Sequence, residues 1–216
     1  MNTSEEWIIK KTPPVFWIFV LAIIFAVVYA TTAYMYTFPG TISIMVVNIC
    51  VTLLIWIKKI SIEDFASTHT GIYSDKQFYR TLTAAFTHVS PIHILMNLVS
   101  LYNIGSVLEP YISSKRFLIL YFIVLIIGGF LSAFIHKSHH PNVLSIGASG
   151  AICGLLGIYI SIIIMLYDEH HLSSMIPTIG ILCLQIFWKQ IDSIAHFSGL
   201  ITGIIVGITY LKLLGY

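Results

Sequence analysis

Long runs without a charged residue constrain the fold of this chain more than any other feature. Each run is close to the roughly 20 apolar residues that a helix needs to cross a bilayer core. Charged residues make up only 9% of the 216 residues, whereas a soluble domain carries about 25%. The chain is therefore predicted to be a polytopic membrane protein, which excludes a disordered chain, a nucleic-acid binder and a cytosolic enzyme. The seven runs are Val15–Tyr36, Thr41–Ile57, Pro91–Leu108, Phe117–Ile135, Ala148–Tyr167, Leu172–Trp188 and Ser193–Leu211.

The remaining segments leave no room for a soluble domain. The one long polar stretch, Lys58–Ser90, mixes polar and apolar residues and is expected to be a loop in the membrane interface. Three cysteines lie in apolar runs without CxxC or Cys/His spacing, so neither a disulfide framework nor a metal site is predicted. These cysteines are Cys50, Cys153 and Cys183.

Polar residues inside spans are informative because burying them in hydrocarbon is costly. The first cluster is His88, His93 and Asn97. His93 and Asn97 are four residues apart and share a helix face, while His88 lies just before that helix.

Two further clusters combine a polar residue with a glycine stripe. Gly147–Gly150 surrounds Ser149 with small residues, and Gly150 is followed by glycines at i+4 and i+7. His196 begins a second stripe with Gly199 and Gly203. Such smooth faces allow helices to approach closely.

The three clusters open the third, fifth and seventh spans, which run in the same direction. They should therefore lie near one membrane face, and close packing of the glycine stripes would bring Ser149 opposite His196. A histidine base can activate a serine nucleophile, and nearby donors can stabilise an oxyanion. The combination favours acyl-transfer chemistry.

Each cluster taken singly has a simpler interpretation. A membrane serine usually bonds its own i−4 carbonyl, His93 with Asn97 could be a structural pair, and glycine stripes usually serve packing alone. Asp192 could orient His196 as in a triad, although an acid that favours the helix N-terminus is the commoner role. His136, beside His139 and His140, is predicted to lie in a solvated loop.

The spaced motifs resemble those of the rhomboid family of intramembrane serine proteases. Phe78–Arg80 looks like the aromatic–Arg motif of the family's first loop, and His88–Asn97 like its His…His-x-x-x-Asn segment. Gly105 and Glu109 are similar to its Gly-x-x-x-Glu. The nucleophile motif, Gly147–Gly150, and the base-helix motif, Ala195–Gly203, are also present.

The resemblance implies an all-α bundle, with a six-helix catalytic domain over 41–216. Residues 1–40 would supply a tail and an extra N-terminal transmembrane helix. It implies a Ser149–His196 dyad that requires no acid. The oxyanion would be held by His88, Asn97 and the Ser149 backbone N–H.

Other matched residues would be structural, with His93 holding the loop onto the bundle. The remaining structural positions are Arg80, Glu109, Gly147, Gly150, Gly199 and Gly203. The resemblance implies transmembrane protein substrates that enter laterally from the bilayer, and no need for a cofactor or metal. A monomer is expected because the bundle encloses its own site, and the low charge content excludes a nucleic-acid partner.

Two features depart from the family pattern. The family often carries an aromatic residue one turn after the nucleophile, where this chain has Cys153. The family's active face is usually non-cytoplasmic, whereas the distribution of lysine and arginine favours the reverse by the positive-inside rule. We expect the family orientation.

Three functions compete on this sequence. An intramembrane serine endopeptidase is favoured. A catalytically silent relative that binds transmembrane clients would lack Ser149 or His196, and both are present. A proton-coupled transporter would show mid-span acids and an internal repeat. The low charge and high isoleucine content favour a bacterial plasma membrane.

Overall fold

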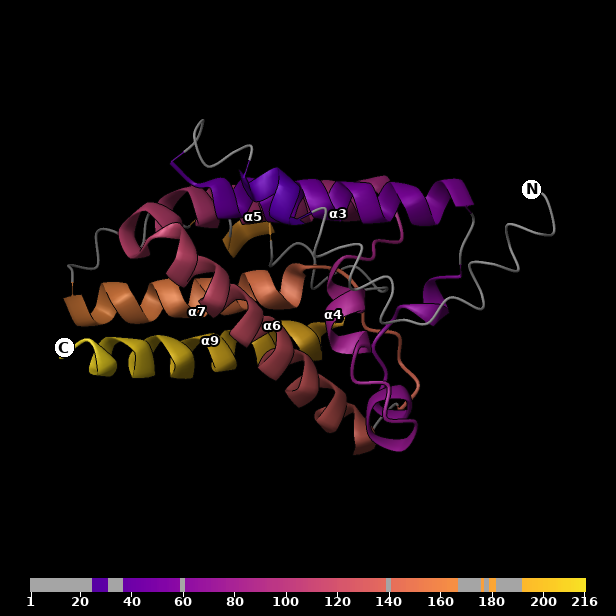
Figure 1. The fold of residues 1–216 in the computed structure, drawn as a ribbon. Coiled ribbons are helices and arrows are strands. Elements are labelled where there is room, and N and C mark those ends of the chain that lie inside the picture. The colour runs from indigo at the N-terminus through magenta and orange to yellow at the C-terminus, as the bar shows by residue number, and fades with distance from the viewer. Residues whose placement is uncertain are drawn as a thin grey trace.

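The structure is a computed structural model that describes residues 25–30, 37–58, 61–138, 141–166, 176, 179–181 and 192–216. Five long helices dominate this part of the chain (Figure 1), and each is long and apolar enough to cross a membrane. They are α3 (Pro39–Lys58), α5 (Pro91–Ile112), α6 (Ser114–Ile135), α7 (Ser149–Leu166) and α9 (Ser193–Leu213). The predicted all-α polytopic bundle is confirmed. The predicted spans Val15–Tyr36 and Leu172–Trp188 lie largely outside the described residues.

The helices form a bundle in which α7 and α9 run side by side in the same direction (Figure 1). Helix α6 crosses them obliquely, while α3 and α5 lie antiparallel to each other on the other side of α7. The starts of α5, α7 and α9 consequently meet at one end of the bundle. The three polar clusters therefore gather at one end, as predicted from the order of the spans.

Helices α7 and α9 touch backbone to backbone along a line of glycines, which we call the glycine seam. A Cβ atom on Gly199 would overlap the carbonyl oxygen of Gly150, and one on Gly203 would overlap that of Gly154. Any side chain at these positions would force the helices apart. The seam consists of Gly150, Gly154 and Gly157 on α7 and Gly199, Gly203 and Gly207 on α9.

The opposite side of α9 is apolar and exposed. Phe197, Ile201 and Ile205 are spaced four residues apart and are 58%, 50% and 59% exposed. In a soluble protein such a stripe would be covered by another element. Facing acyl chains, it is the surface expected of a membrane helix.

Helices α3 and α5 are joined by a buried carboxylate. Glu109, near the end of α5, accepts hydrogen bonds from the backbone N–H groups of Gly40 and Thr41 at 2.8 and 2.7 Å. It also accepts one from the Thr41 hydroxyl. These N–H groups open α3 and have no partner inside that helix. Glu109 thus ties the end of α5 to the start of α3.

The polar stretch between α3 and α5 folds into short elements that pack on the bundle. They are η1 (Ile62–Asp64), η2 (Thr70–Ser74) and α4 (Arg80–Ala85). The Arg80 guanidinium holds this loop together, because its Nη1 donates to the carbonyls of Glu63 and Ala66 at 2.6 and 2.9 Å. Its Nε donates to Gln77. These hydrogen bonds of the Arg80 side chain thus all lie within the loop.

Candidate active site

A buried serine and histidine face each other where α7 and α9 begin. Ser149 Oγ and His196 Nε2 lie 2.7 Å apart, and both residues are only 4% exposed. Ser149 is the first residue of α7 and His196 lies in the first turn of α9. The contact between the two side chains follows from the glycine seam, which allows the helix starts to meet.

The turn before Ser149 requires glycine on two grounds. Gly147 has a φ of +97°, which L side chains rarely adopt. A Cβ atom there would also stand 2.7 Å from His93 Nε2 and 3.6 Å from Asn97 Nδ2. The Gly147 N–H donates to the Ala84 carbonyl at 2.9 Å, which ties the turn to α4. His93 and Asn97 are thus the side chains of α5 that lie against the serine turn.

His93 and Asn97 present unused polar atoms beside this turn. The Asn97 amide donates one hydrogen to the His93 carbonyl at 2.9 Å, which leaves its second N–H hydrogen available. Within the described residues, neither ring nitrogen of His93 has a hydrogen-bond partner, although the ring is buried. Buried polar atoms are rarely left unpaired. Such an arrangement suits groups that act on a ligand or a reacting oxygen.

His88 lies farther back, where it connects the loop to α3. Its Nδ1 is 3.0 Å from the Thr52 hydroxyl, and its carbonyl accepts from Trp56 Nε1 at 3.0 Å. Its ring meets the His93 ring edge to face, with centroids 5.0 Å apart. His88 therefore makes the tie to the bundle that the sequence analysis predicted for His93. Thr52 and Trp56 were missed, although their spacing of four places them on one face of α3.

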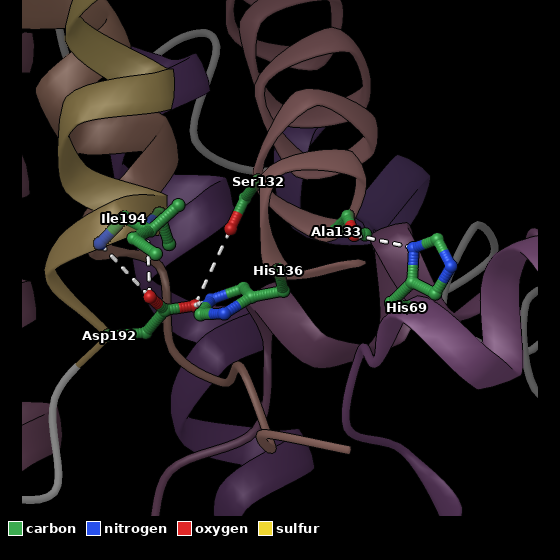
Figure 2. Close-up of polar contacts among 7 residues, drawn as sticks. His69, Ser132, Ala133, His136, Asp192 and Ile194 are labelled. Carbon is green, nitrogen blue, oxygen red and sulfur yellow. Dashed lines mark hydrogen bonds and ion pairs between the residues drawn. The ribbon is translucent and has the colours of Figure 1, made fainter. Parts of the chain in front are cut away.

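Asp192 uses both carboxylate oxygens away from the His196 ring (Figure 2). Its Oδ1 accepts from the N–H groups of Ile194 and Ala195 at 3.0 and 3.2 Å, which caps α9. Its Oδ2 lies 2.9 Å from His136 Nε2. In the described part of the chain, His196 Nδ1 has no hydrogen-bond partner. Of the two roles considered for Asp192, the helix N-terminal role is the one observed.

The prediction that His136 lies in a solvated loop was wrong. The residue directly follows α6, opens η3 (His136–Ser138), and is only 6% exposed. Helix α6 extends far enough to place the ring against Asp192, 56 residues away in sequence. The neighbouring His139 and His140 lie outside the described residues. The i, i+4 pair of Ser132 and His136 was the available signal, because both side chains point to Asp192.

A cleft with about 510 Å³ of empty volume, its opening included, reaches the serine. It lies between α4, α6 and the start of α9, and its lining includes Thr81, Gly128, Ser149 and Ala195. Cys153, one turn after Ser149, is buried in the core of α7. The site thus combines a buried Ser–His pair, two further donors and a cleft, in a helical membrane bundle.

Comparison with known proteins assigns this bundle to a family. The model of the Rhomboid domain matches residues 75–213, which include every element of the site except α3. The chain therefore belongs to the rhomboid family. It is a multi-pass integral membrane protein.

Similar proteins occur in organisms that are far apart. Rhomboid-like protease 3 of Toxoplasma gondii is 28% identical over 68% of this chain and 57% of that protein. RHOMBOID-like protein 5 of Arabidopsis thaliana is 31% identical over 62% and 44%. Rhomboid protease GluP of Bacillus subtilis is 29% identical over 64% and 27%.

The chain spans about half the length of the first two of these relatives, and less of the third. They come from a parasite, a plant and a bacterium, so they do not support the predicted bacterial origin in particular. Two of the three are named as proteases.

Proposed function

We propose that this chain is an intramembrane serine endopeptidase that hydrolyses peptide bonds in or near transmembrane segments. The observation that carries the proposal is the 2.7 Å contact between Ser149 Oγ and His196 Nε2. A neutral imidazole at this distance can take the hydroxyl proton as the oxygen attacks a carbonyl carbon. The family assignment and the names of the relatives support the same reaction.

The reaction then follows the order of acyl transfer. Attack by Ser149 Oγ forms a tetrahedral intermediate, and the protonated His196 gives its proton to the departing amine. This leaves an ester on Ser149, which water hydrolyses with His196 again as the base. Both Asp192 oxygens are engaged elsewhere, so a dyad rather than a triad is proposed.

We assign the oxyanion donors to His93, Asn97 and the Ser149 backbone N–H. This assignment exchanges the roles predicted for the two loop histidines. His93 Nε2 borders Gly147 in the serine turn, while the Thr52 hydroxyl engages His88. The Ser149 N–H lies in the first turn of α7, where N–H groups have no partner inside the helix. His88 is assigned the structural role.

The proposed substrate is a transmembrane helix of another protein. Peptide bonds inside a helix are shielded by their hydrogen bonds, so cleavage requires local unwinding. Segments with glycine, proline or other poor helix formers unwind at a lower cost. We therefore propose that such segments are preferred, and that a monomer carries out the reaction without a cofactor.

The direct test is cleavage of a reporter protein with one transmembrane segment, reconstituted with this protein in lipid vesicles. We expect wild-type protein to release two fragments, and both Ser149→Ala and His196→Ala to release none. Ser161→Ala is the matched control, because Ser161 is also buried on α7 but, among the described residues, bonds only the Gly157 and Ile204 carbonyls.

Cleavage by the Ser161 variant at the wild-type rate would complete the expected pattern. Fragments from the Ser149 variant would contradict the proposal. Binding of the reporter by folded wild-type protein, with no cleavage and no reaction at Ser149, would favour the client-binding alternative.

A further inference from the structure

His136 is tied to the helix that carries His196, although it lies on a different helix. Its ring Nε2 is 2.9 Å from Asp192 Oδ2, and both side chains are 7% exposed. Ser132, one turn earlier on α6, donates to the same oxygen at 3.4 Å. Figure 2 shows the two side chains reaching from α6 toward the start of α9. The pair therefore joins the end of one helix to the beginning of another.

Asp192 also forms hydrogen bonds with the first turn of α9. Its other carboxylate oxygen accepts from Ile194 N and Ala195 N. Its backbone carbonyl accepts from the N–H of His196 at 3.4 Å. One residue thus links His136 to the backbone of His196, one helical turn away.

The other contacts of this turn offer little resistance to sliding. Gly150 faces the Ala195 carbonyl, and Gly128 of α6 stands against the Cα of Gly199. Glycine faces pack closely but carry no side chains that interlock along the helix axis. A buried hydrogen bond to a carboxylate is directional and stronger than a neutral one. It is suited to set the axial position of α9.

We propose that His136 is a positioning residue that fixes His196 against Ser149 through Asp192. The inference rests on the proposed function of the Ser149–His196 pair. A displacement of about 1 Å between reacting groups can reduce a rate about 100-fold. Loss of the connection should therefore slow the chemical step while substrate binding is retained.

The test separates the contact between His136 and Asp192 from the capping of α9 by Asp192. His136→Leu removes the donor, whereas His136→Gln retains an N–H near the position of Nε2. Asp192→Ser retains a good N-cap with a side chain too short to meet His136. We expect His136→Leu and Asp192→Ser each to lower kcat about 10-fold with KM unchanged. His136→Gln should keep most of the wild-type kcat, and the double variant should be no slower than either single variant.

His69→Leu is the matched control. The His69 ring also bonds the end of α6, with Nδ1 2.9 Å from the Ala133 carbonyl, but it does not reach α9 (Figure 2). This variant should keep the wild-type kcat. Hydrogen exchange of the backbone amides of Ile194, Ala195 and His196 supplies a readout independent of turnover. It should be faster than in the wild type for Asp192→Ser and His136→Leu, but not for His136→Gln or His69→Leu.

The outcomes distinguish this inference from the proposed function. If cleavage requires Ser149 but His136→Leu or Asp192→Ser has the wild-type kcat, the positioning role is overturned and the proposed protease function is not affected. Additive losses in the double variant, or equal losses in the Leu and Gln variants, would also overturn it. A wild-type protein that never cleaves would overturn both. If His136→Leu does not fold, Asp192→Ser decides the matter.

Discussion

The two sides of this bundle are held together by opposite means. At the glycine seam, α7 and α9 meet through bare backbone, and the Ser149–His196 pair sits where the seam begins. On the side of α3 and α5, buried apolar side chains of both helices belong to the core, and the Glu109 carboxylate adds hydrogen bonds to the start of α3. The proposed nucleophile and base thus lie where an added side-chain atom has the least space. The side where α3 packs against α5, which we call the loop side, is secured by hydrogen bonds.

This difference shows how two helices that carry reactive side chains can be brought together without side-chain contacts along the seam itself. Close approach of two backbones brings the helix starts together, so two short side chains can meet. On the loop side, the same task needs buried donors and acceptors, each costly to remove. Substitutions at the seam should therefore affect activity as well as stability, whereas substitutions between α3 and α5 should affect mainly stability.

The largest effect is expected at the seam. In Gly199→Ala the added methyl group would overlap the Gly150 carbonyl oxygen, which is backbone and cannot turn away. The helices must separate, so we expect at least about a 100-fold loss of cleavage and a loss of about 1–3 kcal/mol in the free energy of unfolding. Cleavage assays and denaturation in detergent would measure both quantities.

Gly129→Ala is the control for this substitution. Gly129 lies on α6, and its nearest neighbour would be the Thr81 Cβ at 3.4 Å, an ordinary contact. That variant should behave as wild type. Equal tolerance of both substitutions would contradict the account of the seam.

The next effect concerns the proposed oxyanion donors. Asn97→Ala removes a donor beside the serine turn, and the loss of one such donor costs about 10²–10³-fold in kcat in a soluble protease. Asn48→Ala is a close control, since both amides donate to the i−4 carbonyl of their own helix, at 2.9 and 2.8 Å. Both are buried, but Asn48 lies on α3. Similar kcat values for the two variants would remove Asn97 from the mechanism.

A smaller effect, on stability, is expected on the loop side. Glu109→Gln replaces one carboxylate oxygen by an NH₂ group that faces the donors of Gly40 and Thr41. Hydrogen bonds to charged groups contribute about 1.5–3 kcal/mol each, so the free energy of unfolding should fall by about that amount. Thr41→Val, which removes only the hydroxyl donor, should cost less. Folded molecules of either variant should cleave at nearly the wild-type rate.

Over a single pH unit, the smallest effect is a pH dependence of stability. His88 precedes α5, outside the membrane-spanning helices, and burial, with some repulsion from His93, lowers its pKa to about 3. Between pH 6.5 and 3 the unfolded chain binds a proton there that the folded chain does not. Folding stability should therefore fall as pH falls, by up to about 1.4 kcal/mol per pH unit from this group. His88→Gln should show a slope shallower by that amount, and an unchanged slope would contradict the assignment.

The sequence alone predicts the half of the site that depends on spacing. Glycines at i, i+4 and i+7 indicate a close helix contact, and the order of the spans places Ser149 and His196 at the same end. Both expectations agree with the observed geometry. Local spacing was sufficient here because a glycine face has few uses other than close approach.

The other half depends on contacts between distant segments. His88 and His93 are equally plausible donors in the sequence, and their surroundings are set by Thr52 on α3 and by the Gly147 turn. The Asp192 carboxylate is occupied by His136, 56 residues away. Spacing along one helix can mark two side chains that share a face, but it does not identify their partner on another helix. The sequence therefore did not reveal the surroundings of these residues.

The most direct test of the central claim is covalent labelling of the detergent-solubilised protein with a fluorophosphonate probe, which reacts with activated serines. We predict labelling of the wild type and of Ser161→Ala at Ser149. We predict no labelling of Ser149→Ala or His196→Ala. Two results would contradict an activated Ser149–His196 pair. One is labelling of the His196 variant at the wild-type rate, and the other is a folded wild-type protein that the probe does not label.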